Sequence, residues 1–544
     1  MMDLATVPGF GPMLTRRARA HFGGNLNMML ETNPYALTEV AGIGFRHADY
    51  AALYFGIRRA DPRRQAAAAL YVLSEAENDG HTALPLAMFG QRMVEALGES
   101  VGGCDFDDPR VVERDGLISR RVTLEAEERA AALARAMIAR PCPEGLPTLV
   151  DGLADDQAAA LAVIQRANIF CLMGSPGTGK TTLIKSIIRS NPDVRIALCA
   201  PTGKAAKRME EATGTPSRTV HRLLEAGFDE KTRKFLFRRN NANRIDSKLV
   251  VCDESSMLDI RLFASLLEAL AEDCRLILVG DIYQLPSVGP GRVLADLTRR
   301  GAIPNVELTE LKRHDPNLMI ARNCAAIKAG RAPTIANKEA KDFFFIDKGS
   351  EAAIADEVVD IIANRLPAKY GIDPNRDAIV LTALRERGAL SAKELNVRLR
   401  AVLNEGAEGD FAPGDRVIQL SNDYGLDVMN GDLGTVIRRD GRNLMVRFDT
   451  PERIVTEERP DSALHLGHAY ALTVHRFQGS EIPWVVIPIH ESQGAMVPDR
   501  CWAYTAVSRA KAGCVLVGNR NVMQAMINRV RPQERTTRLA GLLA

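Results

Sequence analysis

Eight consecutive residues, Gly174-Ser-Pro-Gly-Thr-Gly-Lys-Thr181, have the types and spacing of a phosphate-binding loop. Glycines at these positions let successive backbone N–H groups close around phosphate oxygens, and the N-terminus of a following helix adds a favourable dipole. The pattern predicts a nucleoside triphosphate site rather than a glycine-rich turn that matches by chance, with Lys180 at the β- and γ-phosphates and Thr181 on Mg²⁺. The residues predicted to bind the nucleotide are Gly174, Ser175, Gly177, Thr178, Gly179, Lys180, Thr181 and Thr182.

Two adjacent acids, Asp253 and Glu254, end the apolar run at 249–252. In enzymes with a phosphate loop, the first such acid helps to hold Mg²⁺ and the second orients or deprotonates the attacking water. We therefore assign Asp253 to the metal and Glu254 to the water. The alternative is that both acids, together with Ser255 and Ser256, only cap the next helix.

Four further polar residues could assist hydrolysis or hold the base of the nucleotide. Gln284 follows the apolar run at 276–279 and can hydrogen-bond a γ-phosphate or its water. Arg313 and Arg509 could each present a guanidinium to the transferred phosphoryl group, an effect worth roughly 10³–10⁵ in rate. Gln157 could seat an adenine edge. Each also has a plain structural interpretation, because the residues around Gln284 form turns readily and most arginines and glutamines lie in solvent.

The elements that must position these residues are short apolar runs that alternate with helical segments from about residue 150 onward. The first series of runs is 169–173, 196–200, 248–252 and 276–279, and the second is 378–382, 484–489 and 514–518. This alternation predicts an α/β fold with two parallel sheets, each covered by helices on both faces. Between the later runs, residues 411–449 contain short alternating stretches with Asn-Gly and Asp-Gly turns, which predict a small inserted β-barrel.

The first sixty residues contain two similar units, each an apolar residue followed by Gly-x-Gly and the start of a helix. Gly9 and Gly11 belong to the first unit, and Gly42 and Gly44 to the second. Such a turn points backbone N–H groups outward at a helix N-terminus and can hold a DNA phosphate without reading sequence. Two units in register resemble a tandem helix-hairpin-helix module and favour DNA contact over ordinary helix–helix turns.

Residues 224–246 interleave cations with aromatic side chains. Phe235 and Phe237 lie among Lys231, Arg233, Lys234, Arg238 and Arg239. Cations follow phosphates, and aromatic rings stack on bases by about 1–3 kcal/mol per base. With a turn at 229–232, the segment predicts a β-hairpin that contacts nucleic acid, and a solvated charged hairpin is the alternative.

Length, charge and cysteine content limit the class of protein to which this chain can belong. The chain has 544 residues, which is too many for one hydrophobic core, and a net charge of only +2, so any basic surface must be local. The sequence contains no uninterrupted apolar stretch of about 18 residues, so it predicts no membrane-spanning helix. The N-terminus lacks the pattern of a signal peptide. The nine cysteines form no Cys-x-x-Cys pair, so neither a zinc ribbon nor a disulfide framework is indicated. We expect a cytoplasmic protein.

The order of the motifs resembles the RecD-like branch of superfamily 1 DNA helicases. The matching segments are the phosphate loop, Ala200-Pro-Thr-Gly-Lys-Ala-Ala-Lys-Arg-Met209, Thr219-Val-His-Arg-Leu-Leu224, Asp253-Glu-Ser-Ser256, Gly280-Asp-Ile-Tyr-Gln-Leu-Pro-Ser-Val288, Gly414-Asp-Arg-Val417, Asn430-Gly-Asp-Leu-Gly434, Tyr470-Ala-Leu-Thr-Val-His-Arg-Phe-Gln-Gly-Ser-Glu481 and Tyr504-Thr-Ala-Val-Ser-Arg-Ala-Lys511. The helix-hairpin-helix front end resembles the stand-alone type, whose longer members carry a further N-terminal domain. The resemblance implies ATP and Mg²⁺ as cofactors and 5′→3′ translocation on single-stranded DNA with duplex unwinding, in repair or recombination.

The resemblance also implies roles for individual residues. Gln157 contacts adenine, Gln284 senses the γ-phosphate, and Arg313 and Arg509 act as arginine fingers. The residues implied to grip the DNA strand are Pro201, Thr202, Thr219, His221, His475, Gln478 and Gly479. Where relatives carry Phe-Arg-Gln, this chain has Leu311-Lys-Arg-His314, which leaves the placement of Arg313 open.

The expected organisation combines these segments into five parts. They are a helix-hairpin-helix module at 1–60, a helical or winged-helix-like linker at 61–145, a first RecA-like motor domain at 146–302 with the hairpin 224–246, a second at 303–400 and 465–544, and an SH3-like barrel at 401–464. The expected partners are single-stranded and tailed duplex DNA, bound by a monomer, with single-stranded-DNA-binding or repair proteins as candidates and no membrane. Two alternatives stay open: an ATP-gated DNA-binding clamp without motor activity, and an RNA-remodelling helicase.

Overall fold

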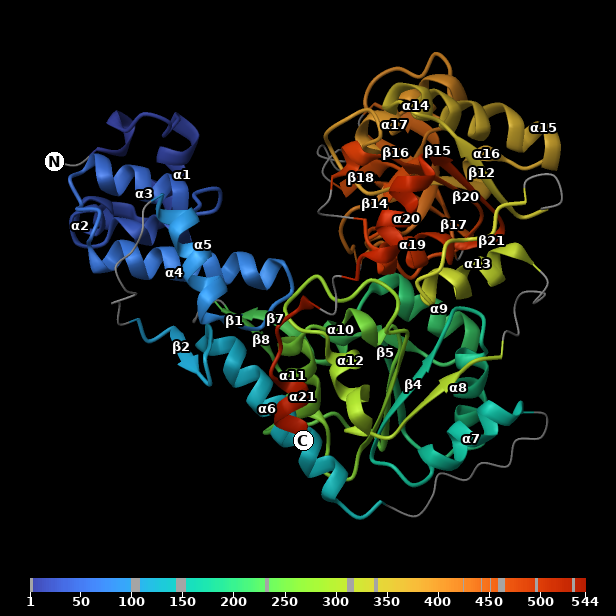
Figure 1. Cartoon of the computed structure of the whole chain (residues 1–544), viewed down its shortest axis with the longest axis horizontal. Helices are drawn as coiled ribbons and strands as arrows, with labels where there is room; N and C mark the ends of the chain where they lie inside the picture. The colour runs from blue at the N-terminus through green and yellow to red at the C-terminus, as the bar shows by residue number, and fades with distance from the viewer. Residues whose placement is uncertain are drawn as a thin grey trace.

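The computed structural model contains two α/β lobes, an N-terminal helical region and an antiparallel sheet (Figure 1). It describes residues 3–98, 108–142, 153–229, 234–310, 318–336, 341–423, 425–441, 443–450, 452–457, 465–494, 498–530 and 534–544. Within these ranges, no helix has the length and apolar composition needed to cross a membrane. We call the lobe that carries the phosphate loop the first lobe and the other the second lobe.

The first lobe is built on six parallel strands in the order β11-β4-β10-β9-β5-β6. These strands are β4 (Ile169–Gly174), β5 (Ile196–Ala200), β6 (Ser217–Thr219), β9 (Leu249–Cys252), β10 (Arg275–Gly280) and β11 (Asn305–Leu308). Val250 and Cys252 enter one apolar core while Leu249 and Val251 enter another, so both faces of the sheet are buried. This arrangement confirms the predicted parallel sheet and explains why its strands are continuous apolar runs. The last strand, β11, lies beyond the boundary predicted at residue 302.

Helices cover both faces of the first sheet. One face packs against α7 (Asp155–Ile164), α8 (Lys180–Arg189) and α9 (Gly203–Thr213). The other packs against α6 (Arg121–Ala139), α10 (Val220–Leu223), α11 (Ile260–Ala269) and α12 (Val293–Thr298). Helix α6 thus belongs to the core of the first lobe, although it precedes the boundary predicted at residue 146.

The second lobe has five parallel strands in the order β12-β21-β20-β13-β19. They are β12 (Phe343–Asp347), β13 (Ala378–Thr382), β19 (Ala471–Thr473), β20 (Ile482–Ile489) and β21 (Ala510–Gly518). The helices are α13 (Met319–Lys328), α19 (Arg500–Val507) and α20 (Arg520–Asn528) on one face, and α14 (Glu351–Asp360) and α17 (Ala392–Leu403) on the other, with α15 (Leu366–Tyr370) and α16 (Pro374–Asp377) between them in sequence. This second parallel sheet was also predicted from the alternation of apolar runs.

An antiparallel sheet is inserted between β13 and β19 of the second lobe. Its strands are β14 (Arg416–Gln419), β15 (Leu433–Asp440), β16 (Asn443–Asp449), β17 (Glu452–Glu457) and β18 (Leu466–His468), in the order β17-β16-β15-β14-β18. Alternate residues such as Val436, Val446 and Phe448 form a separate small core. In the part of the chain that the structure describes, no pairing between β17 and β18 closes this sheet into the predicted barrel.

The N-terminal region packs as one unit. Its elements are α1 (Pro12–Phe22), α2 (Leu26–Thr32), α3 (Phe45–Tyr54), α4 (Pro62–Asn78), β1 (Leu84–Pro85), α5 (Leu86–Leu97), β2 (Val111–Arg114) and β3 (Leu117–Arg120). A single apolar core extends from Leu4 to Ile118, and the three strands pair in the order β1-β3-β2. The packing therefore shows no division at residue 60, where we predicted a boundary.

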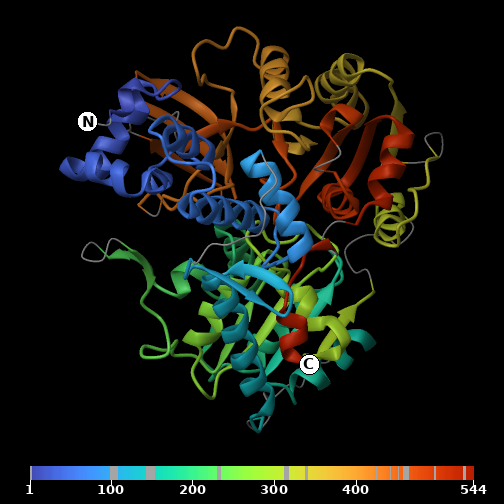
Figure 2. The same cartoon turned by 60° about the vertical axis from the view of Figure 1, so that its left-hand side comes forward.

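The last described segment, residues 534–544, returns to the first lobe, and we call it the C-terminal strap (Figure 2). Its helix α21 (Leu539–Leu543) packs against α6 and α12 in the core of the first lobe. Arg535 donates to the carbonyls of Ser287 and Gly291 at 3.0 and 2.7 Å. We predicted that residues 465–544 belong to the second motor domain. The strap instead belongs to the core of the first lobe, because its apolar residues pack against α6 and not against the second sheet.

Glu127 of α6 anchors the strap. Its Oε1 accepts hydrogen bonds from the Thr82 hydroxyl and from the backbone N–H groups of Arg538 and Leu539 at 2.8, 2.8 and 3.2 Å. The side chain is fully buried, and this burial raises the pKa of Glu127. Loss of this carboxylate leaves the backbone N–H groups of Arg538 and Leu539 without their acceptor, whereas the Thr82 hydroxyl keeps the Thr536 carbonyl at 3.2 Å.

We expect Glu127→Ala to lower the free energy of unfolding by about 2–4 kcal/mol, since buried donors would lose their acceptor and a cavity would form. Chemical denaturation of the purified variant measures this change. Glu128→Ala is the matched control, because the neighbouring side chain is more than a third exposed and pairs with Arg114, which is also exposed. Equal losses in the two variants would contradict the anchoring role.

Candidate nucleotide and nucleic-acid sites

The phosphate loop joins the C-terminal end of β4 to the N-terminus of α8. Gly179 precedes the helix with a φ of +85°, a left-handed conformation that a residue with a Cβ adopts only at a cost. The Lys180 ammonium donates to the carbonyl oxygens of Gly174 and Ser175 at 2.6 and 3.0 Å. The Thr178 hydroxyl donates to the Ser175 carbonyl at 2.9 Å. The loop therefore holds its lysine and its helix N-terminus toward one side of the sheet.

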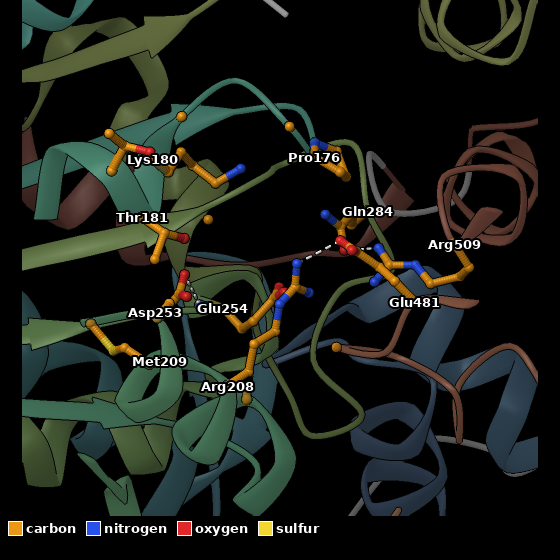
Figure 3. A pocket seen from close by; sticks show the side chains of 17 residues that line it. Pro176, Lys180, Thr181, Arg208, Met209, Asp253, Glu254, Gln284, Glu481 and Arg509 are labelled. Carbon is orange, nitrogen blue, oxygen red and sulfur yellow. Dashed lines mark hydrogen bonds and ion pairs between the residues drawn. The ribbon is translucent and has the colours of Figure 1, made fainter. Parts of the chain in front are cut away.

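That side opens into a cavity of about 330 Å³ between the two lobes (Figure 3). The first lobe contributes Pro176, Gly177, Gly179, Lys180, Thr181, Thr182, Ala205, Arg208, Met209, Ala212, Asp253, Glu254, Gly280 and Gln284, and the second lobe contributes Gly479, Glu481 and Arg509. Most of the residues predicted for nucleotide binding and hydrolysis thus face one shared space, which we call the interlobe cavity.

The two acids follow β9 and lie beside the phosphate loop. The hydroxyl of Thr181 and the carboxylate of Asp253 point toward each other in Figure 3, and together they provide hard oxygen ligands of the kind that Mg²⁺ prefers. Burial, together with the neighbouring Glu254 charge, raises the pKa of Asp253 to about 6, against the opposing influence of Lys180. Glu254 has a φ of +50°, a strained value for a residue with a side chain. This conformation turns the backbone directly after Asp253.

The second lobe contacts the loop that follows β10 through hydrogen bonds of Gln478, Tyr504, Thr505 and Arg509. Arg509 donates to Gln284 Oε1 at 2.7 Å, and its guanidinium is also held by the Thr505 carbonyl at 3.0 Å. The Tyr504 hydroxyl donates to Asp281 at 2.8 Å. The Leu285 N–H donates to the Thr505 hydroxyl at 2.9 Å. Gln284 and Arg509 are each almost fully buried, so the two predicted residues meet at the boundary between the lobes.

Of the residues predicted for the nucleotide site, Gly174, Ser175, Thr178 and Gln157 do not line the cavity. Gln157 is buried behind the phosphate loop, where its amide donates to the Gly179 carbonyl at 3.3 Å. Arg313 lies outside the described residues, so its predicted placement stays a prediction. In this structure Gln157 therefore supports the loop, and its contact with adenine also stays a prediction.

A second cavity, of about 380 Å³, lies between the lobes next to the antiparallel sheet, and we call it the interlobe groove. Its walls include Pro201, Thr202, Gly203, Lys204, Thr219, His221, Met257, Asn422, Asn430, Gly431, His475, Arg476 and Gln478. Six of the residues predicted to grip DNA are among them, although they come from segments far apart in sequence. The seventh, Gly479, faces the interlobe cavity instead. The groove and the cavity thus share the 478–479 turn.

The structure contains the predicted β-hairpin, and one of its two phenylalanines packs against the first lobe. Strands β7 (Ala226–Asp229) and β8 (Lys234–Phe237) pair antiparallel. Phe237 packs against the core of the first lobe, with its ring centroid 5.8 Å from that of His221. The side chain of Phe235 and the residues 230–233 lie outside the described part of the chain. Phe237 is thus partly buried against this core, and its contact with DNA stays a prediction.

The two N-terminal units have the same turn geometry. The N–H of Phe10 donates to Val7 and that of Ile43 donates to Val40, at 3.1 and 3.0 Å. Gly9 and Gly42 have φ values of +88° and +91°, which this turn requires of its third residue. Gly11 and Gly44 are the N-caps of α1 and α3. Two similar turns therefore each lead into a helix N-terminus, although Pro12, the first residue of α1, has no N–H group to offer a phosphate.

Comparison with known proteins agrees with this division of the chain. A model of the ATP-dependent RecD2 DNA helicase HHH domain matches residues 1–83, an AAA domain model matches 157–290, and a UvrD-like helicase C-terminal domain model matches 468–517. The ATP-dependent RecD2 DNA helicase of Deinococcus radiodurans is 33% identical over 99% of this chain and 78% of that protein. The chain belongs to the RecD2 family of ATP-dependent DNA helicases.

Other likenesses are more distant. The RecBCD enzyme subunit RecD of Mycolicibacterium smegmatis is 32% identical to this RecD2-family chain, over 69% of it and 73% of the subunit. A crystal structure of Pif1 helicase from Bacteroides in complex with ADP-AlF3 and ssDNA covers 70% of this chain and 96% of that one, with 17% identity and a TM-score of 0.46.

Sequence reasoning missed several polar residues of this RecD2-family chain that line the two cavities. Arg208 and Glu481 face the interlobe cavity, while Asn422 and Asn430 face the groove. Lys204 also lines the groove, where burial lowers its pKa to about 8. The motifs that we recognised in the sequence contain Lys204, Arg208 and Glu481. Their places in these motifs could have identified them as cavity residues, whereas their residue types alone could not.

Proposed function

We propose that this chain couples ATP hydrolysis in the interlobe cavity to 5′→3′ movement along single-stranded DNA, and that this movement unwinds duplex DNA. The observation that carries the proposal is that both lobes supply side chains to the same cavity, including Lys180 from the first and Arg509 from the second. A ligand that contacts both lobes binds their closed arrangement more tightly than their open one, and this difference in affinity is what drives a motion.

The cavity residues that were predicted from the sequence then have the following tasks. The phosphate-loop N–H groups and Lys180 hold the β- and γ-phosphates. Thr181 and Asp253 would hold Mg²⁺, which supplies charge neutralisation at the phosphates. Glu254 orients the attacking water and accepts its proton. Gln284 detects the γ-phosphate, and Arg509 stabilises the charge that develops on the transferred group; Arg313 is proposed for the same task.

The interlobe groove is the proposed track for the DNA strand. The side chain of Gln478, which lines the groove, donates to the Leu285 carbonyl at 3.0 Å. Leu285 follows Gln284 directly, so one hydrogen bond separates the proposed DNA contact from the proposed phosphate sensor. A change in the position of Gln284 therefore moves the wall of the groove. We assign Pro201, Thr202, Thr219, His221 and His475 to the same track.

The remaining regions are assigned to the duplex. The N-caps Gly11 and Gly44 would hold two DNA phosphates without reading sequence, since their helices direct free N–H groups outward. The β7–β8 hairpin is the candidate for strand separation, with the inserted antiparallel sheet as an SH3-like barrel beside the track. A role in repair or recombination, with single-stranded-DNA-binding or repair proteins as partners, completes the proposal.

Strand displacement on duplexes with only a 5′ or only a 3′ single-stranded tail tests the direction. We expect ATP-dependent opening of the 5′-tailed duplex and no opening of the 3′-tailed one. The reverse preference would contradict the proposed polarity.

Parallel assays separate the alternatives from the motor. ATP hydrolysis at the same rate with and without oligonucleotide, combined with nucleotide-dependent DNA binding, would indicate a clamp. Equal stimulation of hydrolysis by RNA and DNA oligonucleotides would indicate a remodeller of RNA. Stimulation by DNA together with displacement from the 5′ tail supports the helicase.

A further inference from the structure

An ion pair joins the two lobes across the interlobe cavity. Arg208 of α9 lies 2.6 Å from the Glu481 carboxylate, which precedes β20 of the second lobe (Figure 3). The Glu481 side chain is 7% exposed, whereas that of Arg208 is 40% exposed. A nearly buried carboxylate needs a cation beside it, while a cation with one face open to the cavity keeps room for a further anion.

Arg208 faces more than one carboxylate. Burial acts to lower the pKa of Arg208, but the charges of Glu481, Glu254 and Asp253 raise it overall. The guanidinium therefore lies within the electrostatic reach of both acids of the proposed hydrolytic site. A guanidinium in such a position offers several N–H donors in a planar fork, which fits the oxygens of a phosphate as well as those of a carboxylate.

The other cations that line the cavity have different partners. Lys180 is held by carbonyl oxygens of its own loop, and Arg509 by Gln284 and by carbonyls of its own lobe. Among the cavity-lining cations that the structure describes, Arg208 is the one that pairs with a carboxylate of the opposite lobe. Lys511, in the second lobe, lies 3.8 Å from the same carboxylate, so Glu481 keeps a cation when Arg208 is drawn away.

Helix α9 also connects the two cavities. Its N-cap, Thr202, and its second residue, Lys204, line the groove, whereas Ala205, Arg208 and Met209 line the interlobe cavity. A displacement of Arg208 is therefore transmitted along a helix that already contacts the proposed DNA track.

We propose that Arg208 is a nucleotide-binding residue that changes partner when ATP binds: it pairs with Glu481 in the nucleotide-free protein and with the terminal phosphates of ATP in the bound protein. This inference rests on the proposed function of the interlobe cavity. In the nucleotide-free protein the pair ties the lobes together. When ATP binds, its phosphates replace Glu481 as the partner of the Arg208 guanidinium. Phosphate and Glu481 therefore compete for one cation.

Competition predicts that the two partners have opposite effects on nucleotide affinity. Arg208→Ala removes a phosphate contact and should weaken binding of a non-hydrolysable ATP analogue by about tenfold, while Glu481→Gln removes the competitor and should strengthen it by about threefold. The double variant should bind like Arg208→Ala, because Glu481 acts only through Arg208. Arg208→Lys should recover part of the affinity, since it keeps the charge without the planar fork.

Equilibrium titration of the analogue measures these affinities, with Mg²⁺ present in every sample. Arg189→Ala is the matched control, because this arginine is exposed at the far end of α8 and should leave the affinity unchanged. Thermal unfolding of each variant establishes that it is folded. A second readout is the ratio of single-stranded DNA affinities with and without the analogue, which should fall toward one in Arg208→Ala.

The affinities of the variants distinguish an exchange of partners from a purely structural ion pair. Weaker binding by equal factors in Arg208→Ala and Glu481→Gln means a structural ion pair and overturns the inference. So does an Arg208→Ala variant that binds the analogue as the unmodified protein does. If the unmodified protein binds no analogue and shows no DNA-stimulated hydrolysis, the proposed function itself fails. Opposite shifts, with the double variant matching Arg208→Ala, support the exchange of partners.

Discussion

Replacing Lys180 with alanine is expected to abolish DNA-stimulated ATP hydrolysis and strand displacement while single-stranded DNA binding stays measurable. The ammonium is held at the mouth of the phosphate loop by two carbonyl oxygens, at the first residue of α8. Without it, the charge of the β- and γ-phosphates loses its nearest cation, and we expect a fall in hydrolysis of at least about 10³-fold. Release of inorganic phosphate, measured with and without oligonucleotide, gives the rate.

Lys185→Ala provides the control for this variant, because the lysine lies in the same helix and does not line the interlobe cavity. DNA binding by both variants is measured by fluorescence anisotropy without nucleotide. The groove residues belong to other segments, so neither change should remove binding. Unwinding that persists in Lys180→Ala would refute the placement of the nucleotide.

A second large effect is expected from Arg509→Lys. The arginine is 2% exposed and supplies the hydrogen bond to Gln284 from the opposite lobe. Lysine keeps the charge but lacks the planar fork that reaches Gln284, Thr505 and a phosphate together. We expect hydrolysis at saturating ATP and DNA to fall by about 10³-fold or more, since a guanidinium at the transferred group is worth roughly 10³–10⁵ in rate.

The measurement separates turnover from binding. The affinity for a non-hydrolysable analogue should change far less than the maximal rate, because the charge that Arg509 meets develops during phosphoryl transfer. Arg520→Lys is the control, as this arginine lies on the outer helix α20 with more than half of its side chain exposed. A variant that loses analogue affinity and keeps its maximal rate would contradict a role in the transition state.

Some features of this molecule could be predicted from its sequence because the residues that form each of them are close together in the chain. The phosphate loop, the acids after β9 and the continuous apolar strands each lie within a few residues, and the parallel sheets follow from their alternation. The ends of domains were harder to predict. β11 and α6 lie outside the predicted first motor domain because apolar packing, rather than sequence position, decides where they belong.

Contacts between distant segments could not be predicted in the same way. Arg208 and Glu481 are 273 residues apart, and Gln284 and Arg509 are 225 apart, so no local pattern indicates that they meet. Gln157 is a further example: its hydrogen bond to the Gly179 carbonyl, 22 residues later in the chain, was not predicted from the sequence. Family motifs indicated which segments matter, and the fold decides which side chain of each segment faces the cavity.

The C-terminal strap constrains how this protein matures on the ribosome. The backbone N–H that satisfies Glu127 belongs to a residue 411 positions later in the chain. At translation speeds of about 5–20 residues per second, α6 therefore waits roughly 20–80 s for its covering helix. During that interval an apolar helix face is open to chaperones and proteases. A chain truncated before the strap would leave exposed the apolar face of α6 that Leu539 and Leu543 cover.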